Sequence, residues 1–105
     1  MKPIAVVTTV ASKKEARAMA QALVEARLAA CAQISRIESL YAWKGAIEHG
    51  KEYRVLFKTT DESYDAVEHA NRELHSYELP AIHAFAFEHV LPAYAAWIAE
   101  NSRDG

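Results

Sequence analysis

Residues Ala32–Thr60, AQISRIESLYAWKGAIEHGKEYRVLFKTT, decide the fold of this chain. The part Ala32–Trp43 has the composition of an extended strand, Lys44-Gly45 supplies a turn, and Ala46–Thr60 returns as a second strand. This pattern predicts a long β-hairpin. We expect an irregularity near Gly50, because a glycine inside a strand often marks a bulge.

The predicted hairpin is longer than a compact domain is wide. At roughly 3.3 Å per residue, Ala32–Trp43 would span about 40 Å. A compact chain of 105 residues is only about 33 Å across. The tip should therefore project, and it carries Leu40, Tyr41 and Trp43. Because an exposed strand pair with large apolar residues needs covering by another chain, the tip predicts a subunit interface.

The segment before the hairpin predicts a central strand followed by a helix. Ile4–Val10 is largely β-branched and apolar on both faces, which is typical of a strand covered on both sides. Ser12 and Glu15 have capping-box spacing, with the serine oxygen facing the first-turn amides and the glutamate reaching back. One apolar stripe at helical spacing follows: Ala16, Met19, Ala20, Leu23 and Val24. We expect Arg27 in the last turn, where a cation is favourable.

The segment after the hairpin predicts a helix, a strand and a short terminal helix. A threonine pair followed by two acidic residues opens the first of these helices, and residues 75–80, HSYELP, end it. Its helical repeat consists of Tyr64, Val67, Asn71 and Leu74. Ala81–Val90 is apolar on both faces and predicts the last strand. Pro92 opens the terminal helix, and Asn101–Gly105 should fray.

The resulting order is βαββαβ with a terminal helix, within one domain covering residues 1–105. Two βαβ halves joined by a hairpin predict an α+β fold of the ferredoxin-like kind, with a four-stranded antiparallel sheet and helices on one side. The first and last strands are nevertheless apolar on both faces. We therefore expect the open face of the sheet to pack on another subunit.

The composition of the chain excludes some classes of protein and argues against others. Hydrophobic residues make up 51% and charged residues 25%, which excludes a disordered chain. The net charge of −2 argues against a nucleic-acid partner, and no apolar stretch approaches the roughly 20 residues needed to cross a membrane. A single cysteine, Cys31, and the lack of a signal-like start predict a cytoplasmic protein.

Several short motifs, in this order and spacing, resemble the CutA family of divalent-cation-tolerance proteins. The motifs are Ala29-Ala30-Cys31, Glu38-Ser39-Leu40-Tyr41 with Trp43-Lys44-Gly45, Lys58-Thr59, His75-Ser76-Tyr77-Glu78-Leu79-Pro80, and Tyr94 with Trp97. The resemblance covers nearly the whole chain. It implies a ferredoxin-like homotrimer, similar in structure to PII signalling proteins, with hairpins pairing between neighbours. It also implies a role in tolerance to metals, copper especially.

Two residues are the natural candidates for metal ligands. Copper(II) favours imidazole and copper(I) favours thiolate, which points to His75 and Cys31. The alternatives are that Cys31 is a small buried hydrophobic residue and that His75 caps a helix end. Thr8 and Leu74 stand where some CutA members have a cysteine and a second histidine. We therefore expect copper or another divalent cation to be bound only weakly.

A ligand site and an interface are predicted as well. By resemblance to PII-like proteins, Lys58, Tyr77 and Glu78 would bind a small anion or nucleotide in a cleft between subunits near His75. The alternative is that Tyr77, Glu78 and Pro80 only fix the turn and the interface. Four large side chains are interpreted as packing anchors of the interface, namely Leu40, Tyr41, Trp43 and Trp97.

No catalytic motif is present in the sequence. There is no glycine-rich phosphate loop, no Gly-x-Ser-x-Gly elbow and no His-Glu-x-x-His pair, and no base stands beside Cys31. The chain is therefore not interpreted as an enzyme. We expect a metal-tolerance protein that acts by weak metal or small-ligand binding on a trimeric scaffold. The alternative is a PII-like signalling or scaffold module that binds a metabolite or protein and meets metals incidentally.

Overall fold

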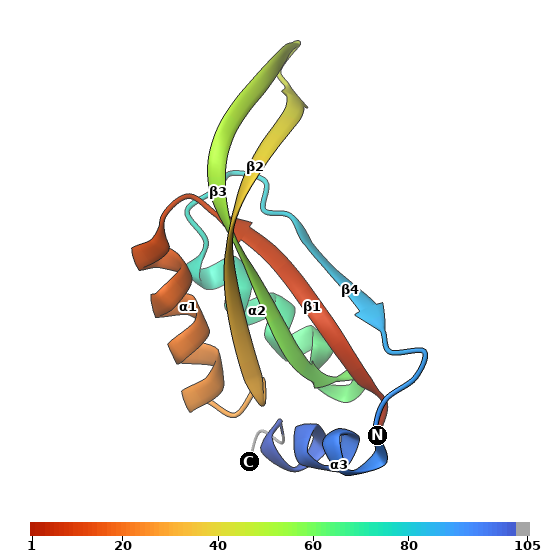
Figure 1. The fold of residues 1–105 in the computed structure, drawn as a ribbon. Helices are drawn as coiled ribbons and strands as arrows, with labels where there is room; N and C mark the ends of the chain where they lie inside the picture. The colour runs from red at the N-terminus through yellow and green to blue at the C-terminus, as the bar shows by residue number, and fades with distance from the viewer. Residues whose placement is uncertain (103–105) are drawn as a thin grey trace.

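The computed structural model describes residues 1–102 and has the predicted order of elements (Figure 1). These are β1 (Pro3–Val10), α1 (Lys13–Glu25), β2 (Cys31–Trp43), β3 (Ala46–Thr60), a 3-10 turn (Asp61–Ser63), α2 (Tyr64–Leu74), β4 (Ile82–Ala86) and α3 (Pro92–Asn101). The strands form one sheet in the order β2-β3-β1-β4, and every neighbouring pair is antiparallel. The ferredoxin-like prediction is confirmed, and β1 lies inside the sheet as expected.

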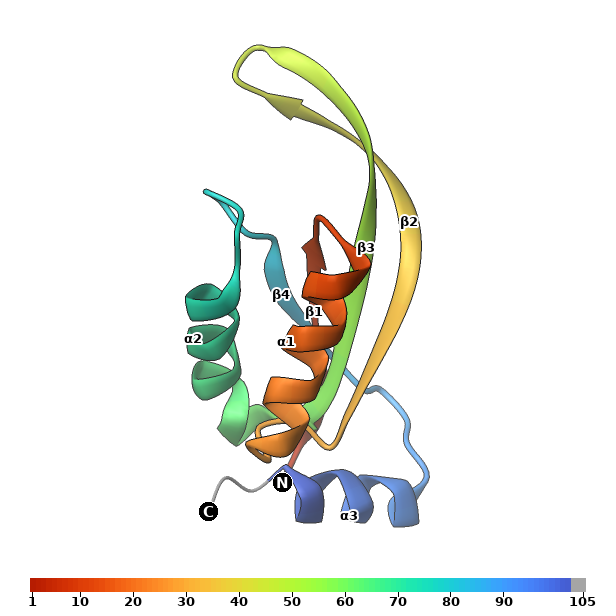
Figure 2. The ribbon, with the colours of Figure 1, turned by 90° about the vertical axis from the view of Figure 1, so that its left-hand side faces the viewer.

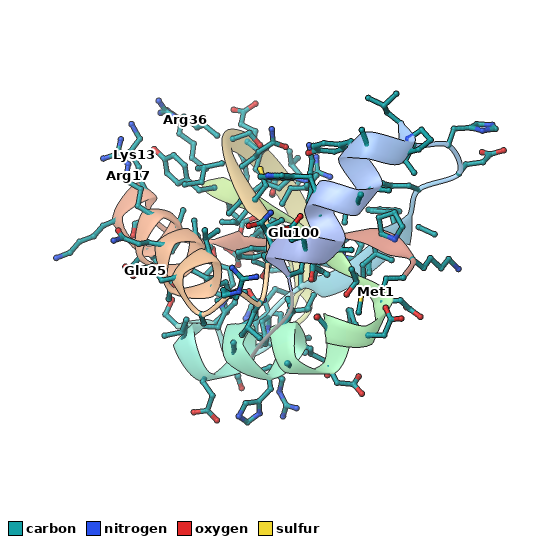
Figure 3. The ribbon with its side chains drawn as sticks, turned by 90° about the horizontal axis from the view of Figure 1, so that it is seen from below. Met1, Lys13, Arg17, Glu25, Arg36 and Glu100 are labelled. Atoms are coloured by element: carbon teal, nitrogen blue, oxygen red, sulfur yellow. The ribbon has the colours of Figure 1, made fainter. Side chains whose placement is uncertain are left out.

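Two of the helices cover the same face of the sheet. Figure 2 shows α1 and α2 together on one side, while α3 crosses below the end of the strands. The view from below in Figure 3 looks onto α3, which carries the labelled Glu100. The opposite face of the sheet therefore carries neither α1 nor α2, which agrees with the one-sided helix layer predicted from the sequence.

The hydrophobic core lies between the sheet and these two helices. It contains Ile4, Val6, Val10, Ala16, Met19, Leu23, Ala29, Val55, Phe57 and Val67. Phe57 is its largest fully buried side chain, and burying such a ring stabilises the fold by about 1.5–3 kcal/mol. Asn71 is also fully buried, and its Nδ2 donates to the Val67 carbonyl at 2.9 Å. The alternation of β1 and β3 thus directs one face of each strand into a single core.

The start of α1 confirms one half of the predicted capping box. The Ser12 Oγ accepts a hydrogen bond from the Glu15 backbone N–H at 3.1 Å, as a capping serine should. The Glu15 carboxylate instead accepts from the backbone N–H and the hydroxyl of Ser76, at 3.1 Å and 3.0 Å. The reciprocal bond expected from Glu15 is therefore replaced by a link to the segment that follows α2.

The end of α1 differs from the prediction for Arg27. The helix ends at Glu25, and Arg27 lies beyond it with a φ of 60°. Its backbone N–H donates to the Val24 carbonyl, and the N–H of Leu28 donates to Leu23. These two bonds form a Schellman motif, which requires the left-handed conformation at this position. Arg27 therefore lies outside the last turn, and its guanidinium donates to the Glu100 carbonyl of α3.

The hairpin projects beyond the rest of the chain, as predicted (Figures 1 and 2). The molecule measures 45 × 26 × 21 Å. At the tip, Lys44 and Gly45 have φ values of 49° and 81°, the pair of positive angles that a type I′ turn requires. The expected irregularity near Gly50 is wrong. Pairing continues without a break from Cys31 opposite Lys58 to Trp43 opposite Ala46, because Gly50 keeps an extended conformation opposite Ser39.

The last strand is shorter than predicted. β4 covers only Ile82–Ala86, whereas the apolar pattern indicated Ala81–Val90. Its last residue pairs with Ile4 of β1. The next partner would be Pro3, which has no backbone N–H to donate. The pairing therefore stops where its partner strand can no longer support it.

The end of α3 is more ordered than predicted. Asn101 belongs to the helix, and its Nδ2 donates to the Trp97 carbonyl at 2.9 Å. Ser102 is buried, and its carbonyl accepts from the Ser63 hydroxyl at 2.9 Å. Fraying is therefore wrong for these two residues, and the rest of the predicted frayed segment, 103–105, lies outside the described residues. No helix within residues 1–102 is long and apolar enough to cross a membrane.

Candidate functional site

A pocket of about 580 Å³ lies between the projecting hairpin and the segment that connects α2 to β4. Its lining residues are Thr9, Ser39, Leu40, Tyr41, Ala42, Trp43, Glu52, Tyr77, Glu78, Leu79 and Ala81. This volume falls within the usual range for small-molecule sites, about 300–1,000 Å³. The pocket unites two groups that the sequence analysis kept apart: the candidate ligand residues Tyr77 and Glu78, and the candidate interface residues at the hairpin tip.

A hydrogen bond between Tyr77 and Glu52 joins the two walls of the pocket. The Tyr77 hydroxyl donates to Glu52 Oε2 at 2.6 Å, and Glu52 is only 9% exposed. Burial, together with the bond and charge of Glu52, raises the pKa of Tyr77 above its usual value. The phenol therefore remains protonated and keeps donating to the carboxylate throughout the physiological pH range.

An exposed ion pair lies beside this pocket. Glu78 Oε2 is 3.6 Å from Nζ of Lys44, and both side chains are largely exposed. The same ammonium group lies 5.5 Å from the centre of the Trp43 ring, within the range of a cation–π contact. The hairpin turn thus supplies a cation that lies against both an aromatic ring and a carboxylate.

His75 has hydrogen-bond partners at both ring nitrogens. Its Nε2 lies 3.0 Å from the Thr8 hydroxyl, and Nδ1 accepts from the Tyr77 backbone N–H at 3.3 Å. An accepting Nδ1 implies that Nε2 carries the proton in the neutral ring. Burial lowers the pKa of His75, while Glu15, the Thr9 backbone and Glu52 act in the opposite direction. His75 thus fixes the start of the segment that carries Tyr77.

Cys31 and Lys58 lie away from the pocket. They oppose each other in the β2–β3 pairing, in register with Ala5 of β1. Since successive side chains of a strand point to opposite faces, this row faces away from Thr8, the partner of His75. The structure therefore does not bring Cys31 and His75 together within one chain. Within residues 1–102, no group of three or more His, Cys, Asp or Glu side chains could hold a metal ion.

The predicted ligand set is divided in the same way. Tyr77 and Glu78 line the pocket, whereas Lys58 is absent from its lining. The Lys58 ammonium instead lies 5.3 Å from the ring centre of Tyr94, on α3. The pocket wall holds Glu52 and Glu78 and no basic side chain among the described residues. Lys44 lies beside this wall with Nζ 3.6 Å from Glu78 Oε2, and the ligand set stays a prediction for the cleft between subunits.

The four predicted interface residues occupy two regions. Leu40 is 70% exposed and Tyr41 46% exposed at the hairpin tip, and both line the pocket with Trp43. Trp97 is 43% exposed on α3 and stacks on Tyr94 with ring centres 5.7 Å apart. In a single chain, large apolar surfaces therefore remain open at both ends of the molecule.

Glu52 is a site residue that the sequence pattern does not identify. Because side chains alternate along β3, Glu52 lies on the same face of the strand as Leu56 and Lys58. The other face carries Val55 and Phe57, which belong to the core. Strand alternation alone would leave the glutamate in solvent. Only the path of the segment after α2 shows that Tyr77 covers it.

Comparisons with known proteins place this fold in one family. Residues 4–101 match the family model described as CutA1 divalent ion tolerance protein. The divalent-cation tolerance protein CutA of Thermotoga maritima is 39% identical over 98 residues, covering 93% of this chain and 97% of that relative. Protein CutA of Mus musculus is 37% identical over 91 residues, covering 86% of this chain and 51% of the mouse protein.

Solved structures show the same arrangement. The periplasmic divalent cation tolerance protein CutA from Archaeoglobus fulgidus has a TM-score of 0.93 and 34% identity, covering 96% of this chain and 99% of that one. CutA from Synechococcus elongatus also has a TM-score of 0.93, with 37% identity, covering 97% of this chain and 91% of that one. Sequence and fold agree over nearly the full length. The chain therefore belongs to the CutA1 divalent ion tolerance protein family.

Proposed function

We propose that this protein functions in divalent-cation tolerance, copper included, as a non-enzymatic homotrimer. The family match over residues 4–101 carries this proposal, together with relatives of similar length that are named divalent-cation tolerance proteins. The family is named for tolerance rather than for a reaction. A growth assay tests the proposal: the gene should raise the copper(II) concentration tolerated by a bacterial strain that lacks its own family member. Unchanged growth would contradict the role.

We propose that metal ions bind weakly and to single side chains rather than to a preformed centre. A thiolate and an imidazole are the ligands that copper prefers, and Cys31 and His75 lie apart within one chain. A metal at His75 would have to displace the Tyr77 N–H from Nδ1, or the proton that Nε2 shares with Thr8. Both displacements lower the affinity of the ring for a metal.

Calorimetric titration of chelator-stripped protein with copper(II) at pH 7 tests this proposal. We expect weak but saturable heat that falls in His75→Ala and Cys31→Ala. His69→Ala is the matched control, because His69 is an exposed histidine of α2 whose single ion-pair partner within residues 1–102 is Glu73. If His69→Ala lowers the affinity for copper(II) as much as His75→Ala and Cys31→Ala do, any surface histidine suffices and the proposal is contradicted.

The trimer is supported by surfaces that a single chain leaves uncovered. The strands at both edges of the sheet, β2 and β4, have free pairing sides within residues 1–102, and Leu40 and Ile47 are exposed on the hairpin. Unpaired edges and exposed apolar side chains favour association. Light scattering should give three times the chain mass, and a monomer at micromolar concentration would contradict this.

We propose the cytoplasm as the compartment, on the basis of the single cysteine. One solved relative is described as periplasmic, so the two compartments are direct alternatives. Fractionation of cells that express the native gene decides between them. Recovery of the protein with periplasmic markers would refute the cytoplasmic proposal.

A further inference from the structure

His83 lies on the face of the sheet that carries neither α1 nor α2. It belongs to β4, the edge strand beside β1 (Figure 1). It pairs with Val7 of β1, and residues directly opposite each other in a sheet share a face. Ile4, Val6 and Val10 of β1 belong to the core between the sheet and the helices. Because side chains alternate along a strand, Val7 and His83 point to the helix-free face.

The imidazole of His83 has apolar neighbours on this face. The ring of Phe85 meets it edge to face, with ring centres 5.2 Å apart and an interplanar angle of 83°. Val7 stands opposite His83, and Leu56 of β3 is the next residue in the same row across the sheet. Phe85 is 54% exposed. A single chain therefore leaves this histidine and its apolar neighbours uncovered.

Within residues 1–102, His83 has no acidic partner. Its ring forms no hydrogen bond and no salt bridge with the described residues. His49 and His69 differ, because each lies beside a glutamate carboxylate, at 3.6 Å and 3.7 Å. A proton on His83 would therefore find no compensating negative charge in its own chain.

The charged groups of the sheet near His83 are cationic. β1 contributes no titratable side chain. Below the hairpin tip, the titratable groups of the other elements around this face are Cys31 of β2; Glu52, Arg54 and Lys58 of β3; Tyr94 and Glu100 of α3; and Tyr77, Glu78, Glu88 and His89 in the segments that flank β4. Arg54 and Lys58 flank Leu56, whereas Glu52 already accepts the Tyr77 hydroxyl. The charges nearest in the sheet thus oppose a further positive charge.

We infer that protonation of His83 weakens the contact between subunits, so that the assembly is tighter at pH 8 than at pH 5. This inference rests on the proposed homotrimer, in which a second copy covers the helix-free face. A neutral imidazole fits such a contact, but an imidazolium would be buried there without a partner in its own chain, and a buried unpaired charge is costly. Imidazoles in water take up a proton at about pH 6.5. Release of a subunit returns the ring to water, so protons favour the separated chain.

Subunit exchange tests this inference on the assembled protein. Two batches, labelled at the N-terminal amine with a donor or an acceptor dye, are mixed at pH 8 and at pH 5, and energy transfer reports the exchange rate. We expect exchange at least tenfold faster at pH 5. Equal rates at the two pH values, with a trimer by light scattering at pH 8, would overturn this inference alone. A monomer at pH 8 would contradict the proposed trimer and this inference with it.

Histidine variants assign the effect to one side chain. His83→Gln keeps a polar side chain that stays neutral at both pH values, and its exchange rate should change less than about twofold. His69→Gln is the matched control, because His69 lies on α2, on the other side of the sheet, and it should keep the acid response. An acid response in His83→Gln as large as in wild-type protein would refute the assignment, and it would also reveal any effect of acid on folding through His75. If His83→Gln does not assemble at pH 8, His83→Leu gives the same comparison with a neutral apolar side chain.

Discussion

Replacing Tyr77 by phenylalanine should destabilise the protein through the loss of one hydroxyl group. The substitution removes the hydroxyl that donates to Glu52 at 2.6 Å and leaves the ring in place. Glu52 is 9% exposed, and Tyr77 supplies its single hydrogen bond within residues 1–102. The variant therefore leaves a buried carboxylate without a donor from the chain, and the connection between the hairpin and the segment after α2 is lost.

The magnitude follows from the chemistry of that bond. A hydrogen bond to a charged group contributes about 1.5–3 kcal/mol to stability, and a buried acceptor left unpaired costs a similar amount. Because the Glu52 carboxylate retains some access to the pocket, we expect the free energy of unfolding to fall by about 2 kcal/mol. Water entering the pocket would satisfy part of the loss, which sets the lower end of the range.

Guanidinium unfolding monitored by circular dichroism measures this change at one fixed protein concentration, since assembly makes stability depend on concentration. Tyr64→Phe is the matched control. Its hydroxyl donates to Glu68 Oε1 at 2.9 Å within α2, where both side chains reach solvent. That variant should lose less than about 1 kcal/mol.

A double-mutant cycle with Glu52→Ala isolates the pair, because alanine removes the acceptor of the Tyr77 hydroxyl. If the bond acts as described, the two substitutions should couple by more than about 1 kcal/mol, well above the additivity error of about 0.3–0.5 kcal/mol. Two results would refute the reasoning: a loss in Tyr77→Phe no larger than in Tyr64→Phe, or a coupling energy within that error.

Three further predictions concern the hairpin and the segment after α2. Trp43→Ala should lower the assembly mass measured by light scattering, because it removes a large side chain from the tip, and an unchanged mass would count against an interface there. Burial lowers the pKa of His75 in the folded chain, so the unfolded chain binds the proton first as the pH falls below about 6.5. Stability contributed by the neutral ring is therefore present above that pH and decreases below it. The variant His75→Asn should flatten the plot of unfolding free energy against pH between pH 7 and pH 5. An equally steep plot in the variant would contradict this role of His75. Glu15→Ala should accelerate amide exchange at Ser76, whose N–H donates to that carboxylate at 3.1 Å, and undiminished protection would show that the bond does not hold the segment.

The fold could be predicted because its signals are local and repeated. The apolar residues of Ile4–Val10 on both faces placed β1 inside the sheet, and the Lys44-Gly45 turn fixed where the hairpin reverses. The length of the hairpin against the width of a domain predicted its projection. Each of these inferences depends on residues that are neighbours in sequence, so the local sequence pattern is enough to predict the structure.

The site could be predicted only in part because its contacts are long-range. Tyr77 was a candidate, but its partner Glu52 shares no local pattern with it. The capping-box spacing gave Glu15 a local partner, whereas the structure pairs its carboxylate with Ser76. The length of β4 depends on Pro3, at the other end of the chain. Where a side chain has two possible hydrogen-bond partners, only the tertiary structure shows which one it binds.

The unbroken register of β2 and β3 also has a kinetic consequence. Once the Lys44-Gly45 turn has closed, each further pair down to Cys31 opposite Lys58 forms next to an existing pair, with little additional loop entropy. β4 must instead find β1 across most of the chain, with Thr8 opposite Ile82. We expect the hairpin to form early and β4 to dock late. Pulse-labelling hydrogen exchange during refolding should therefore protect β3 before β4, and the reverse order would place the folding nucleus elsewhere.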